Sequence, residues 1–230
     1  MTYTGSVRTG QPAAVRELDA LTLRKISVGE MDNNAYLLTC RHTGAQLLVD
    51  AAADAETLLD LVHQGSPTGR LDAVVTTHRH PDHHGALAEV LAATGADHLC
   101  GAQDAAAIGL PVARGLDDAD VVEIGELRLE VIGLRGHTPG SIALAFREPD
   151  LVTADGALPG RAHLMTGDSL FPGGPGRTVT RTDFTQLMTD LEERVFARFD
   201  DATHIYPGHG DDTTLGVERA ALPAWWARGW

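Results

Sequence analysis

The stretch Thr77-His78-Arg79-His80-Pro81-Asp82-His83-His84-Gly85 places four histidines and one aspartate within seven positions. It follows residues 71–76, an apolar run that is typical of a buried β-strand. Imidazole nitrogens and carboxylate oxygens are ligands that Zn²⁺ and similar divalent ions accept. The stretch therefore predicts a metal site at the end of that strand.

The spacing within this cluster indicates two metal positions. Alternate residues of an extended loop can turn to one side, so His78 and His80 can face one centre while Asp82 and His83 face a second. We expect His84 to lie behind these residues or at the surface. The competing interpretation, a solvated histidine cluster, leaves the buried strand that leads into it unexplained.

Length and composition predict one domain over residues 1–230. The chain is 43% hydrophobic over 230 residues, which is enough to bury a full core, and no linker rich in Pro, Gly or Ser divides it. We expect an N-terminal extension at 1–20 and a short helical tail at 211–230. No apolar run approaches the roughly 20 residues that a membrane helix needs, so we expect a soluble protein without a membrane partner.

Charge and cysteine usage narrow the possible partners and the compartment. The chain carries 18 Lys and Arg against 32 Asp and Glu, a formal net charge of −14, whereas nucleic-acid binding requires a basic patch. Cys40 and Cys100 lie in apolar, strand-like runs, where a free thiol acts as a small core residue. We expect no nucleic-acid partner and a reducing, cytoplasmic location.

The hydrophobic pattern predicts an α/β fold of two mixed β-sheets with helices packed outside. Helical spacing is found at 55–63, 85–93 and 182–199, and Thr182 or Asp183 is expected to cap the last helix. Residues 147–161 are polar and rich in Pro, Gly and Asp, which indicates an exposed loop. The strands are expected at 21–28, 35–40, 46–49, 73–76, 98–101, 121–124, 127–132, 142–146, 163–166 and 203–206.

Three further candidate ligands, His137, Asp168 and His209, each lie in a tight turn after a strand-like run. A rigid sheet can present functional groups from such turns. An unpaired carboxylate after an apolar strand is costly unless a cation neutralises it. Taken singly, each of the three has a structural alternative, either a turn histidine or a turn-capping aspartate.

Taken together, these positions resemble the metallo-β-lactamase superfamily over roughly residues 22–210. The family motif His-x-His-x-Asp-His and the later ligand positions are matched in order by His78, His80, Asp82, His83, His137, Asp168 and His209. The resemblance implies an αββα sandwich of two mixed β-sheets flanked by helices. It further implies one metal on His78, His80 and His137, a second on Asp82, His83 and His209, and Asp168 as the bridge.

Such a site predicts a binuclear metallo-hydrolase. Two divalent ions about 3.5 Å apart lower the pKa of a shared water toward neutrality and polarise a carbonyl. We expect zinc, with iron or manganese as alternatives, and catalytic roles for Asp82, which can orient the metal-bridging hydroxide, and Asp168, which bridges the metals. The segments Gly-His-Thr-Pro-Gly-Ser and Thr-Gly-Asp-Ser-Leu-Phe resemble the glyoxalase II branch, which hydrolyses hydroxyacyl-glutathione thioesters.

A basic residue and a short tail bear on the substrate. Arg177, in the Gly-rich turn 173–178, matches the place where glyoxalase II enzymes contact a carboxylate of glutathione, although an arginine paired with surface acid is an equal alternative. Those enzymes also carry a basic C-terminal helical region, whereas only residues 211–230 follow His209 here. The small-molecule substrate can therefore be another thioester or a related ester.

Other activities remain open for the same residues. A persulfide dioxygenase of this superfamily would use one iron on His78, His137 and Asp168. A lactonase would use the same hydroxide on a lactone, and a non-catalytic protein would keep the fold as a metal-binding interaction module. The natural substrate, the metal in the cell and the oligomeric state cannot be read from the sequence.

Overall fold

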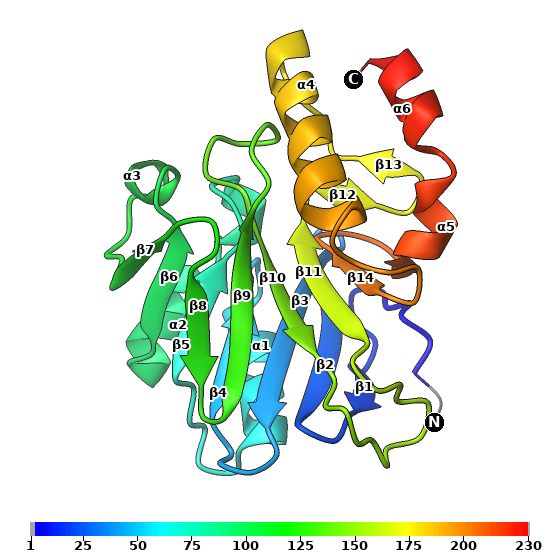
Figure 1. Ribbon diagram of the computed structural model, residues 1–230. Coiled ribbons are helices and arrows are strands. Elements are labelled where there is room, and N and C mark those ends of the chain that lie inside the picture. The colour runs from blue at the N-terminus through cyan, green and yellow to red at the C-terminus, as the bar shows by residue number, and fades with distance from the viewer. Residues whose placement is uncertain (1–2, 230) are drawn as a thin grey trace.

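The computed structural model describes residues 3–229, whose strands form two facing β-sheets (Figure 1). The first sheet has seven strands in chain order: β1 (Ala14–Glu17), β2 (Leu21–Val28), β3 (Asn33–Cys40), β4 (Gln46–Val49), β5 (Ala73–Thr76), β6 (Asp97–Gly101) and β7 (Arg114–Leu116). Its first half is antiparallel, and the pairs from β4 to β7 are parallel. It is therefore a mixed sheet, as predicted.

The second sheet has six strands in the order β15-β14-β11-β10-β9-β8. Their bounds are β8 (Val121–Ile124), β9 (Leu127–Gly133), β10 (Ile142–Arg147), β11 (Ala162–Gly167), β14 (His204–Pro207) and β15 (Thr213–Thr214). The pair of β11 and β14 is parallel and the others are antiparallel. A separate hairpin joins β12 (Leu170–Phe171) to β13 (Gly174–Pro175).

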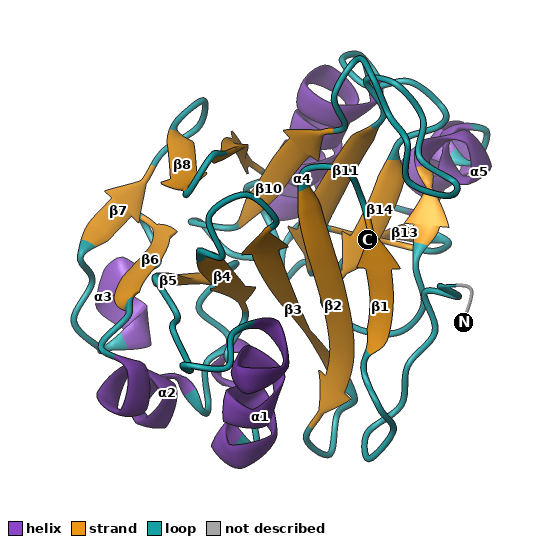
Figure 2. Ribbon diagram, turned by 90° about the horizontal axis from the view of Figure 1, so that it is seen from below, coloured by secondary structure: helices purple, strands orange, loops and turns teal. Residues whose placement is uncertain are grey.

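Helices cover the two outer faces (Figure 2). On the side of the seven-stranded sheet lie α1 (Ala55–Gly65), α2 (Leu87–Thr94) and the short α3 (Ala105–Ile108); on the other side lie α4 (Arg181–Asp190) and its π-helical continuation η2 (Leu191–Phe196). The chain ends in α5 (Leu215–Arg219) and α6 (Leu222–Arg228). The predicted αββα sandwich is confirmed.

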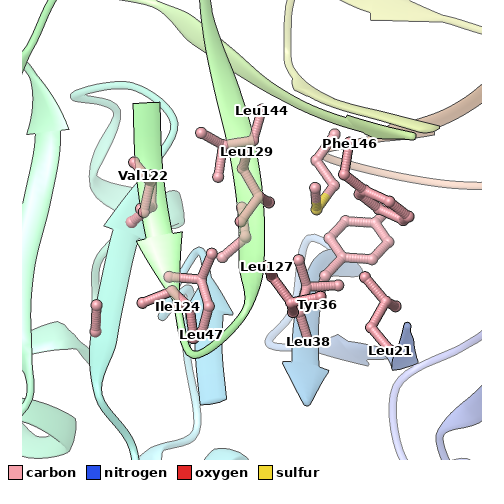
Figure 3. Packing of buried hydrophobic residues seen from close by; sticks show 14 of the residues in the cluster. Leu21, Tyr36, Leu38, Leu47, Val122, Ile124, Leu127, Leu129, Leu144 and Phe146 are labelled. Carbon is pink, nitrogen blue, oxygen red and sulfur yellow. The ribbon is translucent and has the colours of Figure 1, made fainter. Parts of the chain in front are cut away.

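Three buried layers hold the sandwich together. The layer between the sheets joins side chains such as Leu38 and Leu47 to Leu129 and Leu144 (Figure 3). The second layer lies under α1 and α2, and the third under α4 and η2. Successive residues of a strand face opposite sides of its sheet. Strand β3 is buried at every position because both of its faces are covered.

The helix start at α4 differs from the prediction. Thr180 is the N-cap: its hydroxyl accepts a hydrogen bond from the Asp183 amide at 3.1 Å, and the Asp183 carboxylate accepts one from the Thr180 amide at 3.2 Å. This reciprocal capping box satisfies two otherwise unpaired donors. The predicted cap at Thr182 or Asp183 is wrong because both residues already lie in the first helical turn.

The two ends of the chain contribute regular structure. Strand β1, within the expected N-terminal extension, pairs with β2 at the edge of the first sheet. In the tail, Trp225 of α6 is buried against the layer beneath α4. Cys40 and Cys100 are free and buried, as predicted. Within residues 3–229, no helix is both long and apolar enough to cross a bilayer.

Candidate metal centre

The predicted ligands lie at one edge of the sandwich, where strands from both sheets end. The histidine-rich loop, which includes the single turn η1 (Pro81–His83), follows β5. His137 follows β9, Asp168 follows β11, and His209 follows β14. Because β11 and β14 are parallel, their carboxyl ends meet and bring the last two residues together.

One group of ligand atoms comprises His78, His80 and His137, all within 4.8 Å of one another. Nε2 of His78 lies 3.0 Å from Nδ1 of His80. A second group comprises Asp82, His83 and His209. These are the two sets that the family resemblance implied.

The second group is equally tight. Nε2 of His83 lies 3.3 Å from Nε2 of His209, and Oδ2 of Asp82 lies 3.5 Å and 3.4 Å from these two nitrogens. Ligand atoms bound to one tetrahedral zinc at 2.0–2.1 Å are about 3.3 Å apart. The separations in this group therefore suit a single divalent ion.

Asp168 stands between the two groups. Its Oδ2 lies 3.7 Å from Nε2 of His137 in the first group and 3.6 Å from Nε2 of His209 in the second. Two of the three described side-chain atoms that are buried without a hydrogen-bond partner belong to this site, Nε2 of His137 and Oδ1 of Asp168; the third is Oδ1 of Asn34. Buried polar atoms without partners are costly. This arrangement is consistent with a binuclear metal site.

Hydrogen bonds hold three of the histidine rings with Nε2 toward the centre. Nδ1 of His137 donates to the Arg177 carbonyl at 2.7 Å, and Nδ1 of His209 donates to the Met31 carbonyl at 3.0 Å. Nδ1 of His83 donates to the carboxylate of Asp50 at 2.8 Å. Such outer partners select the tautomer and the ring orientation of metal-binding histidines.

Asp50 is a residue of the candidate site that the sequence analysis missed. Its carboxylate is 2% exposed and also accepts hydrogen bonds from the Thr77 amide at 2.7 Å and the Thr77 hydroxyl at 2.8 Å. It therefore ties the start of the histidine-rich loop to His83. A carboxylate directly after the apolar run 46–49 was the available signal, the same pattern that singled out Asp168.

Asp104 connects the histidine-rich loop to the loop that carries His137. Its fully buried carboxylate accepts hydrogen bonds from the Arg79 amide at 3.0 Å, the Gly140 amide at 2.9 Å and the Thr138 hydroxyl. No spacing in the sequence pointed to Asp104, because its partners are 25 or more positions away. Asn33 was missed for the same reason; its amide donates to Asp82 at 2.9 Å.

The electrostatics of the site favour ionised aspartates and one charged ring. Burial opposes ionisation of Asp168, but His83 and the other histidines around it lower its pKa well below the usual value. Burial likewise disfavours the charged form of His83, yet Asp50 and Asp168 raise its pKa to about 10. Burial and the charge of His83 lower the pKa of His78. The centre therefore concentrates negative charge where cations would bind.

Two glycines allow the chain to approach these side chains closely. A Cβ atom at Gly208 would lie 2.0 Å from Oδ1 of Asp168 and 2.7 Å from Cε1 of His83. A Cβ atom at Gly176 would overlap the Asp168 carbonyl. Larger residues at either position would displace the aspartate that joins the two groups.

The remaining predicted residues lie at or outside the edge of the site. Arg177 is exposed, and its carbonyl is held by His137. His84 lies behind the loop, with Nε2 3.2 Å from the Arg79 carbonyl. Five histidines that were given no catalytic role lie outside both ligand groups: His42, His63, His98, His163 and His204.

The class of protein follows from the fold, the site and a family match. A family model described as the metallo-beta-lactamase superfamily matches residues 28–209. The chain belongs to this superfamily. Within it, the chain is similar to the hydroxyacylglutathione hydrolase of Polaromonas sp., with 33% identity over 182 residues, which cover 77% of this chain and 62% of that relative. The chain thus spans about three fifths of that relative's length.

Solved structures agree with this assignment. The BLEG-1 B3 metallo-beta-lactamase superposes with a TM-score of 0.71 at 24% identity, over 88% of this chain and 99% of that one, a likeness of fold. TTHA1623 in a di-iron-bound form superposes with a TM-score of 0.64 at 28% identity, over 85% of this chain and 96% of that one.

Proposed function

We propose that the protein is a binuclear metal-dependent hydrolase that cleaves a thioester or a related ester. The observation that carries this proposal is the position of Asp168, whose Oδ2 lies at nearly equal distances from Nε2 of His137 in the first group and Nε2 of His209 in the second. The similarity to a hydroxyacylglutathione hydrolase supports a thioester substrate.

In this proposal, each group of side chains holds one divalent ion. His78, His80 and His137 would hold the first and Asp82, His83 and His209 the second, and Asp168, whose carboxylate has two oxygens, would serve both. We propose zinc because imidazole ligands suit it, with iron or manganese as alternatives. The di-iron form of TTHA1623 makes iron the first alternative to test.

Bound ions would supply Lewis acidity, which activates a water and polarises the substrate carbonyl. The protein's own side chains would orient the water and the metal ligands. Asp82, anchored by Asn33, can accept a hydrogen bond from the attacking water and orient it. Asp50 keeps His83 in the tautomer with Nε2 toward the centre. A thiolate leaving group, with a pKa near 8.5, needs little help from an acid.

Arg177 is the proposed contact for an anionic part of the substrate. It is exposed, and its main chain touches His137, so the residue borders the centre. A guanidinium can bind a carboxylate through two parallel hydrogen bonds. A cytoplasmic location is proposed with the same function, since the two buried cysteines are free thiols.

Elemental analysis and a substrate panel test the proposal. The purified protein is expected to bind two metal ions per chain and to hydrolyse thioesters without oxygen uptake. One iron per chain with persulfide-dependent oxygen consumption would establish a dioxygenase instead. Preference for lactones would identify a lactonase, and a metal-loaded protein without turnover on any of these substrates would favour an interaction module.

A further inference from the structure

A second polar cavity lies at the opposite end of the same strands. His163 is near the start of β11 and Asp168 follows its end, five residues and about 16 Å away at 3.3 Å per residue. His204 begins β14, which leads to His209. In Figure 1, the loop after β10 lies at the lower edge beside β1, while β12 and β13 lie at the upper edge.

Three arginines face this cavity, which has a volume of 860 Å³. They are Arg16 on β1, Arg41 after β3 and Arg161 immediately before β11, and His204 also lines the cavity. These three cations lie together although the formal net charge of the chain is −14. Two carboxylates, Glu17 and Asp155, also line the cavity, and both are exposed.

A buried chain of hydrogen bonds holds two of the arginines in place. Nε of Arg161 donates to Glu148 at 2.6 Å, and Nε2 of His163 donates to the same oxygen at 2.8 Å. The Tyr206 hydroxyl then donates to Nδ1 of His163 at 2.7 Å and accepts from Arg16 at 2.8 Å. Every link has one donor and one acceptor when His163 is neutral, so the network is satisfied without an added proton.

The arginines retain unused capacity for a ligand. A guanidinium has five N–H donors, and Arg16 and Arg41 each give one hydrogen bond to the protein among residues 3–229, to Tyr206 and to the Leu18 carbonyl. Neither forms an ion pair within that range. Arg161 forms an ion pair with Glu148. Hydrogen bonds from Thr153 and Ala154 lower the pKa of Asp19, and Arg41 lies near enough for its charge to contribute to that shift.

His204, at the cavity wall, has a lowered pKa. Burial is the largest cause and the charge of Arg16 is the next, and with other neighbouring groups they lower the pKa to about 3. The ring is therefore neutral at physiological pH and can donate or accept a hydrogen bond at the cavity wall.

We propose that this cavity binds a small molecule that carries a phosphate or carboxylate group, separately from the metal centre. Guanidinium forks match both oxyanions. Arg16 and Arg41 would supply the free donors, and Arg161 would be held as a third cation by its buried network. The proposal uses none of the metal ligands and is independent of the proposed hydrolase function.

Isothermal titration calorimetry of the metal-loaded protein with inorganic phosphate and with succinate tests this site. At least one of these two anions is expected to bind with a stoichiometry of one per chain. The anion that binds more tightly shows whether the natural ligand carries a phosphate or a carboxylate. Arg16→Gln and Arg41→Gln should each weaken binding at least about tenfold, the loss expected for a charge-assisted contact. Arg128→Gln, which removes an exposed charge on β9, is the matched control.

Two results would overturn the proposal. The first is the absence of saturable binding of either anion up to about 10 mM. The second is binding that survives in both arginine variants and is lost in His80→Ala, because the anion would then occupy the metal centre. If Arg16→Gln misfolds because it disrupts the buried network, Arg41→Gln still tests the site, since the Arg41 side chain lies outside that network. Circular dichroism should show both variants folded.

Discussion

The two sheets contribute to the metal centre in different ways. The seven-stranded sheet supplies His78, His80, Asp82 and His83 from one continuous loop after β5, whereas the six-stranded sheet supplies His137, Asp168 and His209 from three separate turns. The first half of the site is therefore formed by residues that are close neighbours in the sequence. The second half exists only when three strands lie in the right order, so its geometry depends on the whole fold.

The outer hydrogen bonds differ as well. In the first half a side-chain carboxylate, Asp50, orients His83. His137 and His209 are oriented instead by the main-chain carbonyls of Arg177 and Met31. A substitution of Asp50 can therefore remove the hydrogen bond that orients His83. The hydrogen bonds that orient His137 and His209 go to main-chain carbonyls, which a change of side chain does not remove.

The largest expected effect comes from Asp168, which lies between the two groups of ligand atoms. Asp168→Ala should lower turnover by more than about 100-fold, beyond the loss that an outer partner gives, and should reduce the metal content from two ions to one or none. Metal analysis and thioester hydrolysis measure both. Asp60→Ala, an exposed change on α1, is the control. Full turnover in Asp168→Ala would contradict the binuclear proposal.

Removing the side-chain support of the first half should have the next largest effect. Asp50→Asn keeps the shape but loses the charge that faces His83, and should weaken metal affinity about 10- to 100-fold. Competition with a chelator measures the affinity, and Asp97→Asn provides an exposed control. Unchanged affinity would show that the histidine-rich loop orients itself without Asp50.

Removing the side chain of a residue whose main-chain carbonyl orients a histidine should leave the metals in place. Arg177→Ala keeps the carbonyl that holds His137, so the metal content should equal that of the wild type. For a carboxylate-bearing thioester, KM should rise about 1.4- to fivefold, because an exposed ion pair contributes about 0.2–1 kcal/mol. Lower metal content in Arg177→Ala would remove the distinction between side-chain and main-chain support.

The smallest expected effect is the release of a proton when the metal binds. The raised pKa of His83, about 10, means that its ring is charged in the metal-free protein at pH 7.5, whereas the lowered pKa of His78 leaves that ring neutral. A metal binds the neutral ring, so loading should release about one proton from His83. Calorimetry in two buffers of different ionisation enthalpy measures this release, which should fall in Asp50→Asn.

The sign of the pH dependence follows from the same shift. In the metal-free protein, the contribution of His83 to stability is complete below its ordinary pKa of 6.5 and is lost as the pH rises through about 10. Metal affinity should change in the opposite direction and increase over this range. Denaturant unfolding between pH 6.5 and pH 10 checks the first statement, and a flat profile would contradict it.

Much of the fold could be predicted because the hydrophobic pattern is local. The run 73–76 was expected as a strand with the observed bounds, and the runs 121–124 and 127–132 were expected as strands, which β8 and β9 are. The cap of α4 was placed two or three residues too late, because Thr182 and Asp183 are also capping residue types. Short elements such as β1, β7 and β15 gave no pattern long enough to recognise.

The types of candidate ligand, the spacing of the first four and the burial pattern of the strands follow from the sequence alone, since each depends on neighbours within a few residues. The support of the candidate site by Asp50 and Asp104, and the shared cavity of Arg16, Arg41 and Arg161, arise only from the folded arrangement of the strands. These residues are brought together by strand pairing across the sheets, and their spacing along the chain carries no record of that proximity.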